Sequence, residues 1–147
     1  MKLPRLFASL VLLALPAAVH AVDFKSIAPA AVVLYDAPSV KGNKQFIAPR
    51  GMPVEVVLAY GEWVKVRDVS GDLAWTEAKN LSPKRSLIVR SAGAKLRIGA
   101  DEAALPVLAL DKNVLLELVE PVAGGWVKVR HKDGGAGFIK ASEVWGL

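Results

Sequence analysis

An internal repeat is the feature that most limits what this chain can fold into. The segment from Trp63 to Arg67 reads WVKVR, and the same five letters recur from Trp126 to Arg130, 63 positions later. A chance identity of five residues that includes tryptophan is not expected. A repeat of this kind marks two copies of one structural unit, so the 147 residues are expected to form two small domains rather than one larger domain.

The repeat extends upstream of the identical segment with one residue less in the offset. Leu34 matches Leu96 at an offset of 62. The second copy is therefore one residue longer than the first, and the extra residue lies within residues 121–125. Insertions of this kind are absorbed by hairpin tips. At the same offset Gly51 matches Asn113, and these two residue types best tolerate a positive φ angle. We therefore expect an equivalent turn at both positions.

Each copy alternates apolar and polar residues with a period of two, which predicts strands with one buried face. Val64 and Val66 are expected to face the core, and Trp63, Lys65 and Arg67 to face outward. The strands predicted for the first copy lie near residues 32–35, 45–48, 54–59, 63–67 and 73–76. So few short strands can enclose a core only by curling on themselves. The sequence predicts an all-β fold of two small barrels with about five short strands each.

The N-terminus has the pattern of a secretory signal peptide. Lys2 and Arg5 precede an apolar run that ends before Pro16, and small residues stand at both positions that determine cleavage after Ala21. The apolar run is too short to cross a bilayer, which needs about 20 residues. We expect cleavage after Ala21 and a periplasmic or secreted product.

The residue inventory argues against an enzyme. The chain has no cysteine, and His131 is the only histidine outside the predicted leader. A metal site or a catalytic triad needs several such residues within coordinating or hydrogen-bonding distance. A hydrolase that uses carboxylates remains open, but the acids are scattered singly among basic residues. We expect no enzymatic activity, no cofactor and no metal.

Charge gives a weaker indication of the partner. Removal of the leader leaves 17 basic and 14 acidic residues. Residues 78–100 hold six basic residues and no acid, around the junction between the copies. A solvated linker explains this run, and an anionic partner such as a cell-wall polymer or lipid headgroups is the alternative. Nucleic acid is not expected as a partner of an exported protein.

The order of glycines, hydrophobic strands and tryptophan in both copies resembles the bacterial SH3-like (SH3b) domain. In the second copy the resemblance rests on residues 96–97, 113–118, 125–130 and 134–139, and in the first on residues 50–56 and 63–75. Similar exported proteobacterial proteins consist of two such domains. The resemblance implies two tandem SH3-like small barrels with a binding function, often cell-wall targeting. The expected domain limits are 1–21 for the signal peptide, 22–82 for the first barrel, 83–86 for the linker and 87–147 for the second barrel.

The predicted ligand-binding residues are Tyr35, Asp36, Tyr60 and Trp63 of the first copy. In an SH3-like barrel the loop after the first of the five expected strands and the hairpin tip near residue 61 would approach each other. Aromatic faces would stack on a ligand, and the carboxylate would orient it. Arg97 replaces Tyr35 in the second copy, so the two copies cannot present the same surface.

The remaining large aromatic residues are expected to be structural. Trp75 and Phe138 occupy the same position in their repeats and are predicted to pack in the core or the barrel seam, and Trp145 to close the second barrel. A barrel of about 60 residues without disulfides is marginally stable. We therefore expect the two barrels to pack against each other.

Two functions follow as alternatives. The first is a non-catalytic binding module of the cell envelope that recognises peptidoglycan or a peptide. The second is a structural or adaptor protein that scaffolds another envelope protein. The sequence does not identify the ligand, the partner or the oligomeric state.

Overall fold

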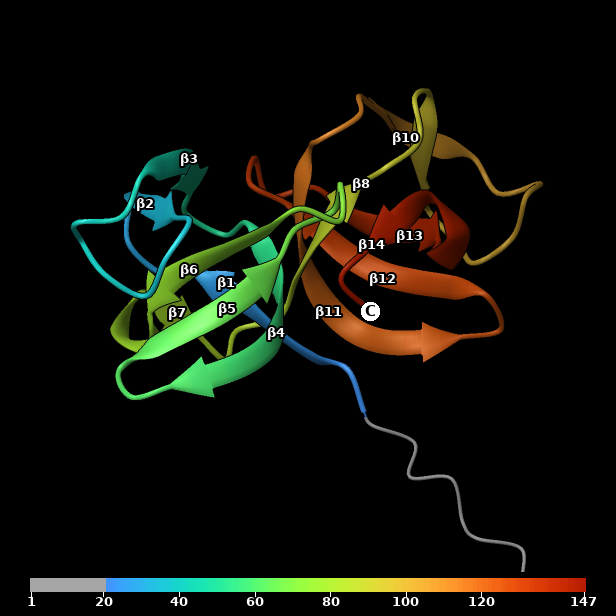
Figure 1. Ribbon diagram of the computed structural model, residues 1–147. Helices are drawn as coiled ribbons and strands as arrows, with labels where there is room; N and C mark the ends of the chain where they lie inside the picture. The colour runs from blue at the N-terminus through green and yellow to red at the C-terminus, as the bar shows by residue number, and fades with distance from the viewer. Residues whose placement is uncertain (1–20) are drawn as a thin grey trace, which may run out of the picture.

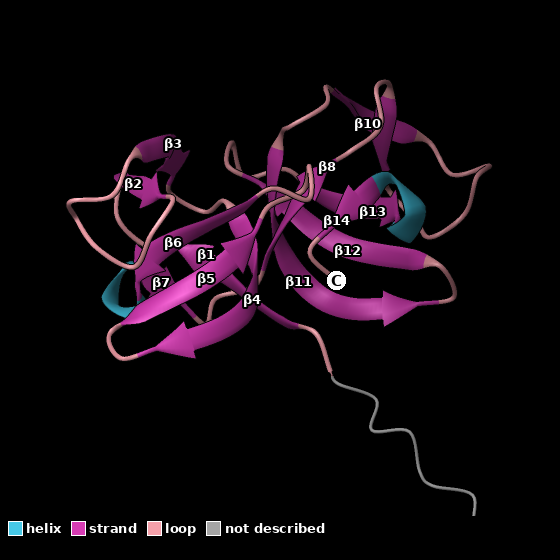
Figure 2. Cartoon of the chain, in the orientation of Figure 1, coloured by secondary structure: helices cyan, strands magenta, loops and turns pink. Residues whose placement is uncertain are grey.

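The computed structural model describes residues 21–147, which form two strongly bent antiparallel sheets lying side by side (Figure 1). Each sheet contains seven strands, and the helical residues of the described part are confined to two single turns (Figure 2). The predicted all-β fold is confirmed. The predicted signal peptide lies outside the described residues, except for Ala21.

The first barrel has the strand order β3-β2-β6-β5-β4-β1-β7. Its strands are β1 (Asp23–Ile27), β2 (Ala31–Tyr35), β3 (Lys44–Pro49), β4 (Pro53–Tyr60), β5 (Trp63–Arg67), β6 (Leu73–Glu77) and β7 (Leu81–Ser82), and the single turn η1 (Ala78–Asn80) precedes β7. β4 pairs with β1 through its first half and with β5 along most of its length. A register shift between Val56 and Leu58 lets this long strand bend from one partner to the other.

The second barrel repeats the topology with the order β10-β9-β13-β12-β11-β8-β14. Its strands are β8 (Ser86–Val89), β9 (Ala94–Arg97), β10 (Pro106–Leu110), β11 (Leu115–Ala123), β12 (Trp126–His131), β13 (Ala136–Lys140) and β14 (Val144–Trp145), with η2 (Ala141–Glu143) before β14. The matching order shows that the sequence repeat is a structural repeat.

Each sheet contains two strands beyond the five predicted. β2 to β6 agree with the expected ranges to within one residue at each end, and β1 and β7 complete the first sheet. β1 pairs with both β4 and β7. Only Pro83, Lys84 and Arg85 separate β7 from β8, so Ser86 of the predicted linker is already in a strand.

The core of each barrel is built from the inward face of its strands. Val64 and Val66 are buried, as are Val127 and Val129 at the equivalent positions. Burying one such side chain stabilises the fold by about 1.5–3 kcal/mol. The first core contains Ile27, Val32, Leu34, Ala48, Met52, Val54, Val64, Val66 and Ala74, and the second contains Leu87, Val89, Ala94, Leu96, Leu110, Leu116, Val127, Val129, Ile139 and Val144.

The predicted equivalence of Gly51 and Asn113 is confirmed by the backbone. Gly51 has a φ of 82° and Asn113 a φ of 72°. Both residues precede the long strand of their barrel. Asn113 is the only residue other than glycine with positive φ in residues 21–147, which explains why only these two residue types fill the position.

The two barrels contact each other through the linker and the C-terminus. The hydroxyl of Ser26 in β1 donates a 2.7 Å hydrogen bond to the carbonyl of Lys84. Arg85 uses a terminal guanidinium nitrogen to donate a 2.6 Å bond to the carbonyl of Gly146, and its own carbonyl accepts from the amide of Leu118. The linker is therefore fixed on both sides, and the expected packing of the barrels is confirmed.

Trp145 takes part in this interface instead of serving the second barrel alone. Its ring lies edge-on to Phe24 of the first barrel, with ring centroids 4.9 Å apart. The guanidinium carbon of Arg85 lies 5.6 Å from the Phe24 ring centroid on the linker side. Phe24 is buried although it does not belong to the core of its own barrel, because the second barrel and the linker cover it.

Candidate ligand-binding surface

Tyr35 and Trp63 come together on the outer face of the first barrel. Tyr35 ends β2 and Trp63 begins β5, and their rings meet edge to face with centroids 5.9 Å apart. Because inward valines alternate with Trp63 along β5, its indole points away from the core. Both rings are half-buried, which leaves part of each available to a ligand.

Tyr60 adjoins the same pair across the β4–β5 hairpin. It is the register partner of Trp63, and residues directly opposite each other on neighbouring strands share a face. Tyr60 is 67% exposed, the largest exposure of any aromatic side chain in the described residues. The structure thus brings together the three aromatic residues that the sequence predicts for the site.

Asp36 has a defined role in its loop. One carboxylate oxygen accepts a 2.8 Å hydrogen bond from the backbone amide of Asn43, and the other accepts a 2.8 Å bond from the side-chain amide of Asn43. The amide of Asp36 donates to the carbonyl of Asn43. The carboxylate therefore closes the loop between β2 and β3 and fixes Tyr35 at its start. The proposed role of Asp36 in orienting a ligand stays a prediction.

Trp75 belongs to this surface. Of the two positions expected for it, the core and the barrel seam, the structure excludes the core. It pairs with Tyr35 on one side and with Lys65 on the other, so all three residues share the outer face. The Lys65 ammonium lies 5.8 Å from the centroid of the Trp75 ring. Ala74 and Thr76, which flank Trp75, are the buried residues of β6. The alternation of small and large side chains in β6 was the sequence signal for this arrangement.

We name the set Tyr35, Tyr60, Trp63 and Trp75, together with Lys65, the aromatic face. Its four rings come from four adjacent strands of one sheet, β2, β6, β5 and β4. Aromatic rings held by paired strands offer stacking surfaces at a small cost in conformational entropy. Such a face can bind a sugar ring, a peptide or another flat apolar group, with a cation beside it.

The equivalent face of the second barrel has a different chemistry. Arg97 occupies the position of Tyr35, as its pairing with Phe138 shows, and donates a 2.8 Å hydrogen bond to the carbonyl of Ala104. Lys128 forms a 2.8 Å ion pair with Glu120 and lies 6.0 Å from the Phe138 ring centroid. Phe138 points outward like Trp75, so the core is excluded for it as well, and the barrel seam is the remaining expected position. The second barrel keeps Trp126 and Phe138 at the positions of Trp63 and Trp75. Arg97 and Ala123 stand at the positions of Tyr35 and Tyr60, so its outer face carries two of the four rings.

Two ion pairs at the edges of these faces shift the pKa values of their members. A hydrogen bond from Lys79 to Glu77 and the attraction between their charges raise the pKa of the Lys79 ammonium. This ion pair lies beside Trp63, because Glu77 is the register partner of Trp63 on the neighbouring strand. Lys140 donates to Glu102 and thereby lowers the pKa of that carboxyl group. Both pairs are at the solvent-exposed surface, where they contribute to the pattern of charge more than to stability.

His131 takes part in a surface turn. It ends β12, and its Nδ1 lies 3.3 Å from a carboxylate oxygen of Asp133, while its amide donates to the carbonyl of Gly135. Within residues 21–147 no three His, Cys, Asp or Glu side chains gather as a metal site would require. No helix in the same range is long and apolar enough to cross a membrane.

The described chain is a tandem of two small β-barrels that share one strand order. The bacterial SH3 domain family matches residues 28–83 and again residues 90–146. The chain therefore belongs to the bacterial SH3 domain family and carries two copies of that domain, which confirms the resemblance drawn from the repeat. The two matches are to SH3 domains alone.

Comparison with solved structures finds similar chains at low sequence identity. NlpC2 from Trichomonas vaginalis is 10% identical, with a TM-score of 0.40, over 87% of this chain and 49% of that chain. An NlpC/P60 family protein from Bacillus cereus is 16% identical, with a TM-score of 0.39, over 83% of this chain and 55% of that chain. The chain thus spans about half the length of these structures. A search of curated proteins found no match.

Proposed function

We propose that this protein is a non-catalytic binding module of the bacterial cell envelope that recognises peptidoglycan or a peptide through the aromatic face. The observation that carries the proposal is the gathering of Tyr35, Tyr60 and Trp63 on one exposed surface of the first barrel. A core residue gains stability from burial, whereas a tyrosine that is 67% exposed gains little. Aromatic rings that lie outside the core on adjacent strands are available to contact a ligand.

The asymmetry of the two copies supports the same proposal. The fold needs the core positions, and both copies retain apolar residues there, such as Val64 and Val127. Two outer positions differ, with Tyr35 replaced by Arg97 and Tyr60 by Ala123, which is the register partner of Trp126 as Tyr60 is of Trp63. Because the same scaffold stands without these tyrosines in the second barrel, the fold does not require them. Ligand binding is the function that fits their position.

The export that the proposal requires rests on the sequence pattern of residues 1–21. Envelope polymers and envelope proteins are the partners that an exported protein meets. Detection of the chain in a periplasmic extract, starting at Val22, would establish this part of the proposal separately from binding.

Retention on purified sacculi tests the proposal directly. The full-length and Tyr60→Ala proteins are incubated with sacculi and washed at moderate salt. The loss of one stacking ring is expected to weaken retention about two- to tenfold, which corresponds to about 0.5–1.5 kcal/mol. Val122→Ala is the matched control, because Val122 is 49% exposed on the corresponding hairpin of the second barrel. It should leave retention unchanged.

Two results would contradict the proposal in different ways. Retention of Tyr60→Ala and of Tyr35→Ala at the level of the unchanged protein would remove the aromatic face from wall binding. Absence of any retention, together with capture of a specific envelope protein, would favour the adaptor function. Thermal unfolding of each variant shows whether the barrels remain folded, and truncation of the exposed Tyr60 should cost under about 0.5 kcal/mol.

A further inference from the structure

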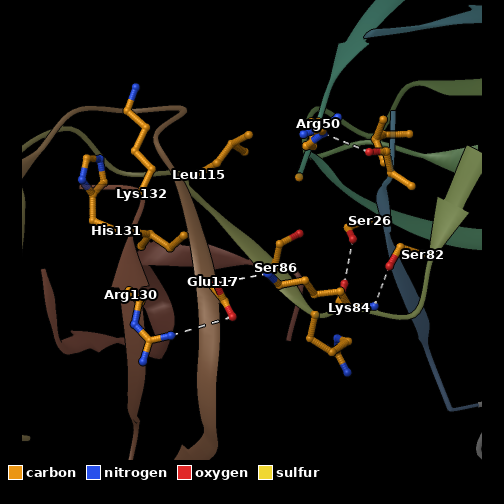
Figure 3. A pocket seen from close by; sticks show the side chains of 15 residues that line it. Ser26, Arg50, Ser82, Lys84, Ser86, Leu115, Glu117, Arg130, His131 and Lys132 are labelled. Carbon is orange, nitrogen blue, oxygen red and sulfur yellow. Dashed lines mark hydrogen bonds and ion pairs between the residues drawn. The ribbon is translucent and has the colours of Figure 1, made fainter. Parts of the chain in front are cut away.

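A groove with a volume of about 410 Å³ lies between the two barrels (Figure 3). One wall comes from the first barrel, where Arg50 and Gly51 form the turn before β4. The other wall comes from β11 and β12 of the second barrel, and the linker closes the end between Ser82 and Ser86. We name it the inter-barrel groove. Its volume lies within the range of small-ligand sites.

Basic residues from both barrels surround the inter-barrel groove. Arg50 stands on the first-barrel wall, Arg130 and Lys132 stand on the second-barrel wall, and Lys84 lies between them (Figure 3). The acid of the lining is Glu117, whose carboxylate lies 3.3 Å from the Lys84 ammonium and 4.0 Å from an Arg130 nitrogen. The charge of Glu117 is therefore already compensated.

Arg50 and Lys132 carry positive charge that no acid neutralises within residues 21–147. The Nε of Arg50 donates a 3.1 Å hydrogen bond to the carbonyl of Ala28, which fixes the direction of the side chain. The terminal nitrogens of Arg50 have no hydrogen-bond partner in the described chain. Two cations on opposite walls are thus available to an anionic ligand.

The floor of the inter-barrel groove contains a hydroxyl group without a hydrogen-bond partner and apolar side chains. Ser86 is only 8% exposed, and its hydroxyl has no hydrogen-bond partner in the part of the chain that the structure describes. Figure 3 shows this hydroxyl directed toward the space between Arg50 and Leu115. Ile27 and Leu116 line the same groove. A buried hydroxyl without a partner costs about 1–3 kcal/mol unless a ligand or water satisfies it.

We propose that the inter-barrel groove is a second binding site, which accepts a short acidic peptide segment. Carboxylates of the peptide pair with Arg50 on one wall and Lys132 on the other, and an aliphatic side chain between them lies against Leu115. The Ser86 hydroxyl donates to the peptide backbone. This site is separate from the aromatic face and does not depend on the function proposed for that face.

The spacing and the type of the groups favour an acidic peptide over a single compact anion. A phosphate is held best where several donors converge on one point, but Arg50 and Lys132 stand on different walls. Guanidinium groups match carboxylates in a planar, two-pronged geometry. The apolar floor between the cations adds a preference for an aliphatic side chain, which alternating acidic and aliphatic residues supply.

The test uses the full chain and an acetylated, amidated pentapeptide of alternating glutamate and leucine as the probe. Titration followed by backbone amide NMR is expected to shift the signals of Gly51, Ser86 and Leu115. The same peptide with glutamine in place of glutamate should bind at least tenfold more weakly. Arg50→Gln and Lys132→Gln should each weaken binding about three- to tenfold.

Lys112→Gln is the matched control for Arg50→Gln. Lys112 is the repeat equivalent of Arg50 and is exposed, but it does not line the groove. Its substitution removes the same charge and should change affinity less than twofold. Equal losses for Lys112→Gln and Arg50→Gln would overturn the proposal, because attraction by the net charge would then explain binding.

Two further results would also overturn it. Equal binding of the glutamine and glutamate peptides would exclude recognition of carboxylates. Saturable shifts of the groove amides by inorganic phosphate, combined with no shifts by the glutamate peptide, would define a compact-anion site instead. Shifts confined to Tyr60 and Trp63 would place the peptide on the aromatic face and leave the groove without this ligand.

Discussion

Replacement of Phe24 by alanine is expected to uncouple the two barrels. Phe24 is 9% exposed, yet its partners are Trp145, 4.9 Å away between ring centroids, and the guanidinium of Arg85. Truncation of a buried phenylalanine typically costs 3–5 kcal/mol. A small domain core supplies about 3–5 kcal/mol in total. The loss is therefore comparable to the whole stability of one barrel.

Calorimetry and urea unfolding of the full chain provide the measurement. The unchanged protein should unfold in one cooperative transition, because the contact between Phe24 and Trp145 couples the unfolding of the two barrels. Phe24→Ala should lower the midpoint and split the transition into two. Phe46→Ala is the control, because Phe46 belongs to the same barrel but is 48% exposed, and its loss should leave one transition.

A double-mutant cycle isolates the contact itself. Phe24→Ala and Trp145→Ala should be coupled by about 0.5–1.5 kcal/mol, the usual contribution of an edge-to-face pair beyond its buried area. A coupling energy within about 0.3 kcal/mol of zero would refute the reasoning. The same conclusion would follow if the unchanged protein unfolded in two transitions that matched those of the variant.

Two further predictions concern the second barrel. Gly137→Ala should destabilise it by about 1–3 kcal/mol in urea unfolding, because the added methyl carbon would lie 2.5 Å from the backbone carbonyl oxygen of Arg97. Ala74→Gly at the equivalent position of the first barrel should cost only about 0.5–1 kcal/mol. Equal costs for the two variants would contradict the steric argument. Lys140 lowers the pKa of Glu102 below its ordinary value of 4.5, so the ion pair stabilises the fold above that pH and is lost as the pH falls through the lowered pKa. Thermal unfolding of Glu102→Gln should accordingly depend less on pH below 4.5 than that of the unchanged protein, and identical profiles would contradict it.

The repeat and the period of two were sufficient to predict most of the fold. The alternation of Val64 and Val66 with polar neighbours identified the core face, and the match of Gly51 to Asn113 located a turn with positive φ. Both features are local, because strand alternation and turn conformation depend on neighbouring residues. β1 was missed because Phe24 is buried by the second barrel, which no local pattern shows.

The candidate site was predictable only in part. The aromatic residues Tyr35, Tyr60 and Trp63 could be grouped because the topology of the resembling family brings their strands together. Trp75 was assigned to the core or the barrel seam because large aromatic residues in strands are usually buried, but its neighbours Ala74 and Thr76 occupy the inward face of β6. Size favours burial on average, but strand phase decides which face a residue occupies.

The inter-barrel groove could not be predicted from sequence at all. Its two available cations, Arg50 and Lys132, are more than 80 positions apart and meet only because the barrels dock. The docking contact also uses different surfaces of the two copies. Phe24 of β1 in the first barrel meets Trp145 of β14 in the second. A groove built from unlike surfaces exists once in the pair and has no counterpart inside either copy.

The separate origins of the two surfaces lead to a last prediction. The aromatic face lies within one barrel, whereas the groove needs Arg50 and Lys132 held on opposite walls. The double variant Phe24→Ala/Trp145→Ala removes both rings of the contact between the barrels, leaves the residues that line the groove unchanged, and should free the barrels from each other. At a temperature where both barrels remain folded, it should bind the glutamate peptide at least tenfold more weakly.

Retention of the same double variant on sacculi should stay at the level of the unchanged protein, because the rings on β2, β4, β5 and β6 keep their sheet. Amide NMR dispersion for the strands of both barrels serves as the control for folding. Loss of both activities together in folded protein would mean that the aromatic face also needs the docked pair. Preserved peptide binding would mean that the barrels stay docked without this contact or that the groove is not the peptide site, and the NMR shifts of Gly51 and Leu115 distinguish these two cases.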